Sequence, residues 1–96
     1  MRGETPTIKA SVAGRQTVYV VQPFEMRQQG RRTGLAPASP IPARDSSHAK
    51  LLLERTAHRT GIVGVVAFSR TGDPATGDYD DAIIIGQVGQ VPEELA

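Results

Sequence analysis

Residues 45–68 read DSSHAKLLLERTAHRTGIVGVVAF, and this stretch decides the fold. Asp45 and the two serines after it can each cap the free amides of a first helical turn. Apolar or small residues then recur at spacings of three and four, the period of an amphipathic helix; these are Ala49, Leu52, Leu53, Thr56 and Ala57. Gly61 supplies a left-handed stop. We therefore predict a helix over residues 46–60 and a buried strand over residues 62–68.

Two further stretches predict strands, because they are rich in β-branched residues. The first covers residues 17–22, and Pro23 should end it or place it at a sheet edge because proline has no amide hydrogen for the ladder. A continuation through Phe24 and Met26 after a kink is the alternative. The second covers residues 82–88, where Gly86 and Gly89 indicate a bulge or the end of the strand.

A short hairpin arm is predicted between the first strand and the helix. Gly30 can take the positive φ that a turn over residues 28–31 requires, and residues 32–35 would form the return strand. Three prolines make residues 36–43 an extended connector.

The predicted fold class is α+β: a small, mainly antiparallel sheet with one amphipathic helix packed on one face. The element order is strand, short strand arm, helix, strand, strand. We expect residues 1–15 to form a flexible N-terminal tail, residues 16–91 a single domain, and residues 92–96 a C-terminal tail.

Composition narrows the class of protein. A chain of 96 residues is one domain's worth, and the absence of cysteine removes disulfides, thiol nucleophiles and cysteine-type zinc sites. The chain holds no apolar run of the roughly 18 residues that a membrane helix needs. We expect a soluble cytoplasmic protein with no cofactor and no membrane partner. Nine of the 11 basic residues are arginine, which with the abundant glycine and proline suggests a bacterial source.

The sheet predicted from these strands is apolar on both faces. Successive strand residues point to opposite faces, so Val65 and Ala67 share one face while Val66 and Phe68 share the other. One helix covers one face only, and a contiguous apolar patch is rarely left to water. We therefore expect a homodimer, formed through the second apolar sheet face or through strand edges.

Charge is unevenly distributed behind the net value of +1. Residues 1–44 carry seven basic and two acidic side chains, whereas residues 71–96 carry six acidic side chains and no basic one. Such asymmetry is typical of a surface that binds a polyanion, or of two ends that attract each other within or between chains.

The basic half holds a candidate nucleic-acid site. Arginines at the tip of a hairpin arm can contact phosphates, and helix cations could extend the surface. The candidate residues are Arg27, Arg31, Arg32, Lys50, Arg55 and Arg59. The alternative is a solvated surface whose arginines pair with the protein's own acidic loop.

The acidic half holds a candidate metal site. Asp73, Asp78, Asp80 and Asp81 lie within nine residues, and hard cations such as Ca²⁺ or Mg²⁺ prefer clustered oxygen ligands. The spacing differs from that of an EF-hand. Asp73-Pro74 is also a standard turn opening, so a solvated hairpin loop is the alternative.

No pattern of catalytic residues stands out. The chain has neither the Gly-x-Ser-x-Gly elbow nor a phosphate-binding glycine loop, and Glu54 with His58 at i, i+4 fits a surface pair. We therefore favour a small non-enzymatic, homodimeric interaction or regulatory module. The alternatives are a nucleic-acid-binding protein that uses the basic hairpin and helix face, and a small metal-dependent enzyme centred on the acidic loop.

Overall fold

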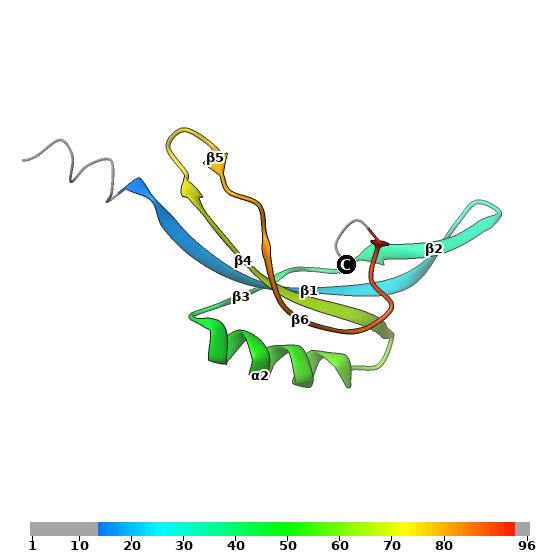
Figure 1. Cartoon of the computed structure of the whole chain (residues 1–96). Helices are drawn as coiled ribbons and strands as arrows, with labels where there is room; N and C mark the ends of the chain where they lie inside the picture. The colour runs from blue at the N-terminus through cyan, green and yellow to red at the C-terminus, as the bar shows by residue number, and fades with distance from the viewer. Residues whose placement is uncertain (1–13, 94–96) are drawn as a thin grey trace, which may run out of the picture.

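The computed structural model describes residues 14–93, which form one helix and a single mainly antiparallel, curled sheet (Figure 1). The elements are β1 (Gln16–Gln29), β2 (Arg32–Pro37), β3 (Ile41–Ala43), α2 (Ser46–Ala57), β4 (Ile62–Asp73), β5 (Asp78–Tyr79) and β6 (Ile83–Gly89). The α+β class is confirmed, with β3 and β5 as short strands beyond the predicted order. The tail expected over residues 1–15 lies almost wholly outside the described residues.

The two long strands β1 and β4 form the centre of the sheet, paired antiparallel from Gln16↔Gly72 to Glu25↔Ile62. The other edge of β1 is shared by β3 and β2, which pair with successive parts of it. The other edge of β4 is shared by β5 and β6 in the same way. Every pairing is antiparallel, and each of the four short strands pairs with a much longer neighbour.

Helix α2 begins as predicted and ends earlier. The Asp45 carboxylate accepts a hydrogen bond from the His48 amide at 2.8 Å, which caps the first turn. The predicted end at Thr60 is wrong, because the chain tightens after Ala57: the Arg59 amide donates to the Thr56 carbonyl at 3.0 Å in a three-residue step.

No helix within residues 14–93 is both long and apolar enough to span a membrane.

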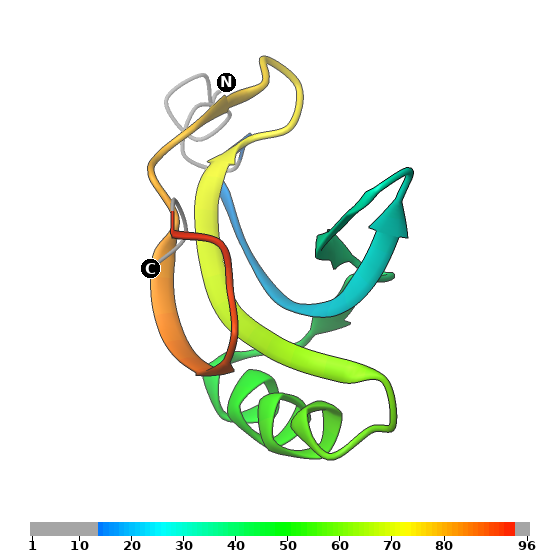
Figure 2. The ribbon, with the colours of Figure 1, turned by 90° about the vertical axis from the view of Figure 1, so that its right-hand side faces the viewer.

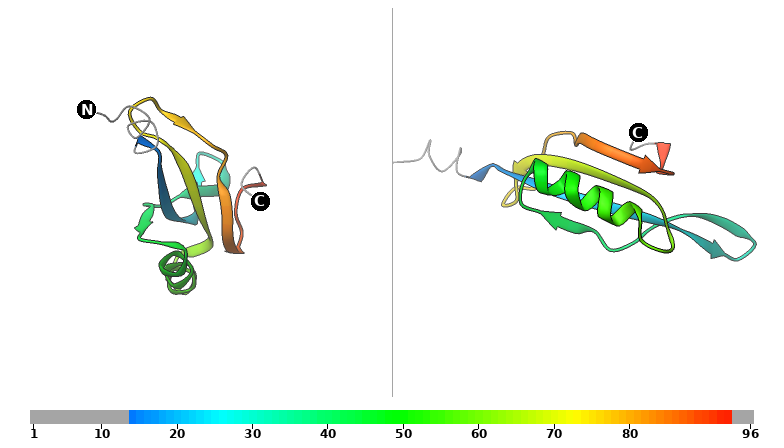
Figure 3. Two further views of the ribbon diagram at one scale, coloured as in Figure 1. Left: turned by 60° about the vertical axis from the view of Figure 1, so that its left-hand side comes forward. Right: turned by 90° about the horizontal axis from the view of Figure 1, so that it is seen from below.

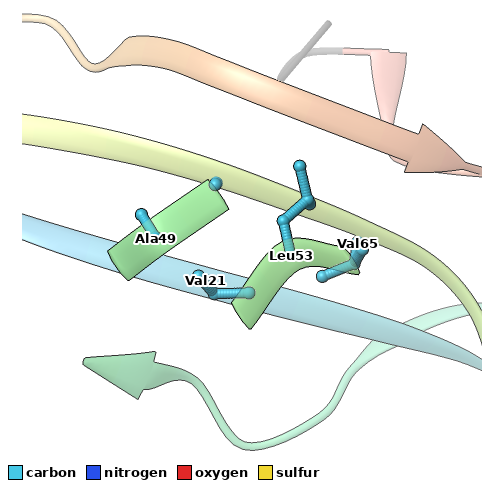
Figure 4. Close-up of a cluster of buried hydrophobic side chains, with 5 residues drawn as sticks. Val21, Ala49, Leu53 and Val65 are labelled. Carbon is cyan, nitrogen blue, oxygen red and sulfur yellow. The ribbon is translucent and has the colours of Figure 1, made fainter. Parts of the chain in front are cut away.

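The core lies between α2 and the sheet. Val21 of β1, Ala49 and Leu53 of α2, and Val65 of β4 gather there, as Figure 4 shows. Ala67 completes this buried cluster. The apolar stripe predicted on the helix therefore meets the sheet face that carries Val65 and Ala67.

Pro23 neither ends β1 nor lies at the edge of the sheet, contrary to the sequence prediction. β3 pairs with β1 up to Val21, and β2 pairs with it from Phe24 onward, so Pro23 faces the gap between these two short strands. Its carbonyl accepts the Ala38 amide at 3.0 Å on that side. The missing amide hydrogen therefore points where no ladder bond is due.

Two β-bulges accompany the curl of the sheet. Phe24↔Gly64 is followed by Glu25↔Ile62, which leaves Val63 as an extra residue on β4. On the other side of β4 the extra residue is Ile85 of β6, next to Gly86 as the sequence suggested. Bulges bend and twist the strands that contain them. Figure 2 shows the sheet bent into a deep curve, with α2 outside the bend.

The curl buries part of the second apolar face without a second helix. Phe24 and Val66 lie on the inner side of the curve and are almost fully buried. The segment after β6 turns back along this side (Figure 2), and the Gln90 amide donates to the Val63 carbonyl at 2.9 Å. What stays open is the far end of the inner face, where Val18 and Ile84 are 40% and 39% exposed.

We expect Gly64→Ala to lower the free energy of unfolding by about 1–3 kcal/mol, the usual cost of overpacking. A Cβ atom at this position would collide with the backbone of Gln90, so the returning segment would have to move. Gly34→Ala in β2 is the control, because nothing lies within 4 Å of its Cβ position and its φ is not positive. Urea denaturation of both variants checks this, and an equal loss in the two would contradict it.

Candidate functional site

The far end of the β1–β2 hairpin stands clear of the rest of the sheet. The pairing of β1 with β4 stops at Glu25, while its pairing with β2 continues from Met26↔Leu35 to Gln29↔Arg32. Residues 26–35 therefore form a two-stranded ribbon with no third strand, which we call the basic ribbon. It projects past the end of α2 and β4 (Figures 1 and 3). Gly30, with φ of 64°, makes the predicted turn at its tip.

The register of the basic ribbon sorts its side chains between two faces. Arg27 lies opposite Gly34, and Gln29 lies opposite Arg32, so these four residues share one face. The other face carries the apolar pair Met26–Leu35 and, beyond it, the polar pair Gln28–Thr33. Arg31 occupies the turn. One face and the tip thus present all three arginines.

The ion pairing of these arginines differs. Arg27 donates to the Glu25 carboxylate at 2.6 Å, two residues back on the same strand face. Arg31 and Arg32 are exposed and form no ion pair with another residue of the described range 14–93. The outer half of the basic ribbon is therefore cationic without local neutralisation.

The helix cations of the predicted nucleic-acid site lie on a separate element. Lys50, Arg55 and Arg59 are exposed on α2 and just after it. α2 packs against β4, β6, β1 and β3, and the ribbon leads away from it in Figures 1 and 3. Of the two groups of cations in the predicted nucleic-acid site, only the arginines of the basic ribbon lie together on one narrow projecting element.

The acidic residues lie at the opposite end of the sheet, around the β4–β5 turn (Figure 1). Asp73 holds the turn itself: its carboxylate accepts the Ala75 amide at 2.9 Å, and its carbonyl accepts the Gly77 amide at 2.8 Å. Asp78 starts β5 directly opposite Asp73. Within residues 14–93, no three His, Asp or Glu side chains gather as ligands for a metal ion.

The basic partners of this acidic end are not those of the hairpin. The Asp80 carboxylate accepts from Arg15 at 2.7 Å. Arg70 lies over the Tyr79 ring, 5.4 Å from its centroid, and reaches the Asp80 carbonyl at 3.4 Å. The alternative in which the hairpin arginines pair with this chain's own acidic loop is wrong for a single copy, because the two groups lie at opposite ends.

A third surface, the outer edge of β6, was not singled out in the sequence. β6 pairs with β4 along one side, and no strand among the described residues pairs with its other side. Its sequence, IIIGQVG, contains no charge. Ile83 is 66% exposed and Val88 is 44% exposed. The uncharged run could be read from the sequence, but its place at an edge depends on the strand order.

The two histidines have local structural roles. His48 accepts the Arg44 amide through Nδ1 at 3.0 Å, which ties the approach to α2 onto its first turn. His58 is the residue that ends the helix, and its amide donates to the Arg55 carbonyl.

Comparison with known proteins identifies no relative. No protein-family model, no curated protein and no solved structure matches the chain.

The acidic end gives a clear expectation for metal ions. Because Asp73 and Asp80 already accept hydrogen bonds or an ion pair, we expect millimolar Ca²⁺, Mg²⁺ or Mn²⁺ to leave the melting temperature within error of its value in a chelator. Differential scanning fluorimetry checks this. A rise that depends on cation concentration, and that Asp78→Asn abolishes, would restore the metal-site hypothesis.

Proposed function

We propose that this protein is a non-enzymatic interaction module that works as a homodimer, with two copies paired along the outer edges of β6. The observation that carries the proposal is an open edge strand without a single charge. Natural proteins usually guard such edges with lysine, proline, a β-bulge or a covering segment, because the free amides and carbonyls invite another strand. The edge of β6 has a bulge at Ile85 but no lysine or proline, and it carries exposed isoleucine and valine.

A second copy fits this edge better than an unrelated strand does. Two identical strands that pair antiparallel about a two-fold axis satisfy each other's backbone groups in the same way. The Ile83 end of one strand then meets the Val88 end of the other, twice. By register with β4, both residues point to the helix side of the sheet, so two apolar pairs would be buried.

Charge at the ends of β6 is compatible with this arrangement. Asp80 and Asp81 precede the strand, and three uncharged residues, 90–92, separate it from Glu93 and Glu94. An antiparallel pair therefore sets Asp80 and Asp81 of one copy beside the uncharged residues 90–92 of the other. Strand edges suit the contact better than the second sheet face does, because Phe24 and Val66 on that face are already buried within one chain. The cytoplasmic location and the bacterial source remain predictions from the composition.

Light scattering after size exclusion should give a mass twice that of the 10.2 kDa chain. Ile83→Lys should give the monomer, since it places a charge on the edge without disturbing the core, and Val88→Lys should act in the same direction. Leu51→Lys is the matched control: Leu51 is 45% exposed and belongs to α2 rather than to β6, so this variant should stay dimeric.

A wild-type chain that stays monomeric at high concentration would refute the dimer. A dimer that survives both lysine variants, or that Leu51→Lys disrupts as well, would place the interface elsewhere.

A further inference from the structure

We propose that the basic ribbon, residues 26–35, is a binding site for double-stranded DNA that makes its contacts chiefly to the phosphates. This site is independent of the β6 edge, so neither proposal depends on the other. It rests on three features of the ribbon: its isolation from the sheet, the chemistry of its side chains and its narrow shape.

The chemistry of the ribbon matches an acceptor-only ligand. Its ten residues include three arginines, two glutamines and a threonine, and no acidic residue. Arginine offers only donors, in a planar fork that suits phosphate oxygens. Arg27 and Arg32 share a face with Gln29, and Gly34 adds no side chain there. A phosphate could therefore approach the strand backbone closely on this face.

The shape of the ribbon matches a groove. Two paired strands are about 5 Å apart, and the two-residue turn at Gly30 and Arg31 keeps the tip as narrow as the strands. The major groove of B-form DNA is about 12 Å wide and admits a two-stranded ribbon. The corresponding groove of duplex RNA is deep and narrow, so side chains do not reach into it.

Two other ligands fit less well. Single strands are held mainly by stacking on aromatic rings, and residues 26–35 contain none. An acidic protein surface also offers carboxylates to the arginines, but it lacks the regular row of phosphates that a duplex presents. The net charge of +1 does not oppose binding, because the acidic end lies at the far end of the sheet (Figure 1).

Fluorescence anisotropy of a short labelled duplex of mixed sequence tests the proposal across a range of salt concentrations. Three phosphate contacts predict that log K falls with log[salt] with a slope of about −2 to −3 per ribbon. Arg31→Ala with Arg32→Ala should remove about two units of that slope and weaken binding at low salt at least tenfold. Arg31→Lys with Arg32→Lys should keep most of the slope, because the charge remains.

The control removes the same charge from the other end of the molecule. Arg15→Ala with Arg70→Ala takes two positive charges from the acidic end, and it should leave the duplex affinity within about twofold, since exposed charges beyond a Debye length are screened. Equal losses in the two double variants would mean that net charge, rather than the ribbon, sets the affinity, and would overturn the site.

Competition with unlabelled polyanions identifies the preferred ligand. Duplex DNA should displace the probe better than single-stranded DNA, duplex RNA or polyglutamate. If any of these three competes as well as the duplex, the assignment to double-stranded DNA is wrong. Absence of binding at low salt would remove the proposal altogether.

Discussion

The antiparallel pairing of β1 with β4 is the constraint on which the rest of this structure depends. Both strands carry apolar side chains on both faces, and both are long enough to hold two short partners on their outer edges. One helix of 12 residues covers one face only. The sheet bends at two bulges, so that the inner face closes partly on itself and on the segment after β6. The curvature therefore buries part of the second apolar face, which a second helix covers in other folds.

The same pairing also determines which parts of the molecule stay uncovered. β4 begins at Ile62, opposite Glu25, so the hairpin beyond that point has no third strand. β6 lies on the outside of β4 and has no neighbour of its own among the described residues. The chemistry of these two uncovered features differs, because the ribbon is cationic and the edge of β6 is apolar.

The local signals in the sequence predicted what is local in the structure. Asp45 caps the helix, Gly61 takes a φ of 88° before β4, and Gly30 makes the hairpin turn. Each of these depends on a few neighbouring residues and on backbone chemistry that only certain residues allow. The α+β class followed from the 3.6-residue period in α2 and the apolar runs around it.

The prediction for Pro23 was wrong because distant parts of the chain determine the structure around it. Pro23 lies mid-strand only because β3 stops before it and β2 starts after it, which no local rule shows. Other features were out of reach of local rules without being errors. The curl that buries part of the second face is a property of several strands together, and the ion pair of Asp80 joins it to Arg15, 65 residues away.

The positions of the charges matter more to this protein than their sum. Opposite charges at the two ends of one sheet are screened from each other at physiological salt, where the Debye length is about 8 Å. Each end therefore meets its surroundings with its own local charge. At the acidic end Arg15 and Arg70 offset part of that charge. At the ribbon, Glu25 offsets Arg27 alone, so Arg31 and Arg32 face the solvent at full charge. An isoelectric point near 8.2 describes neither end, and the ribbon behaves as a cationic surface on a nearly neutral molecule.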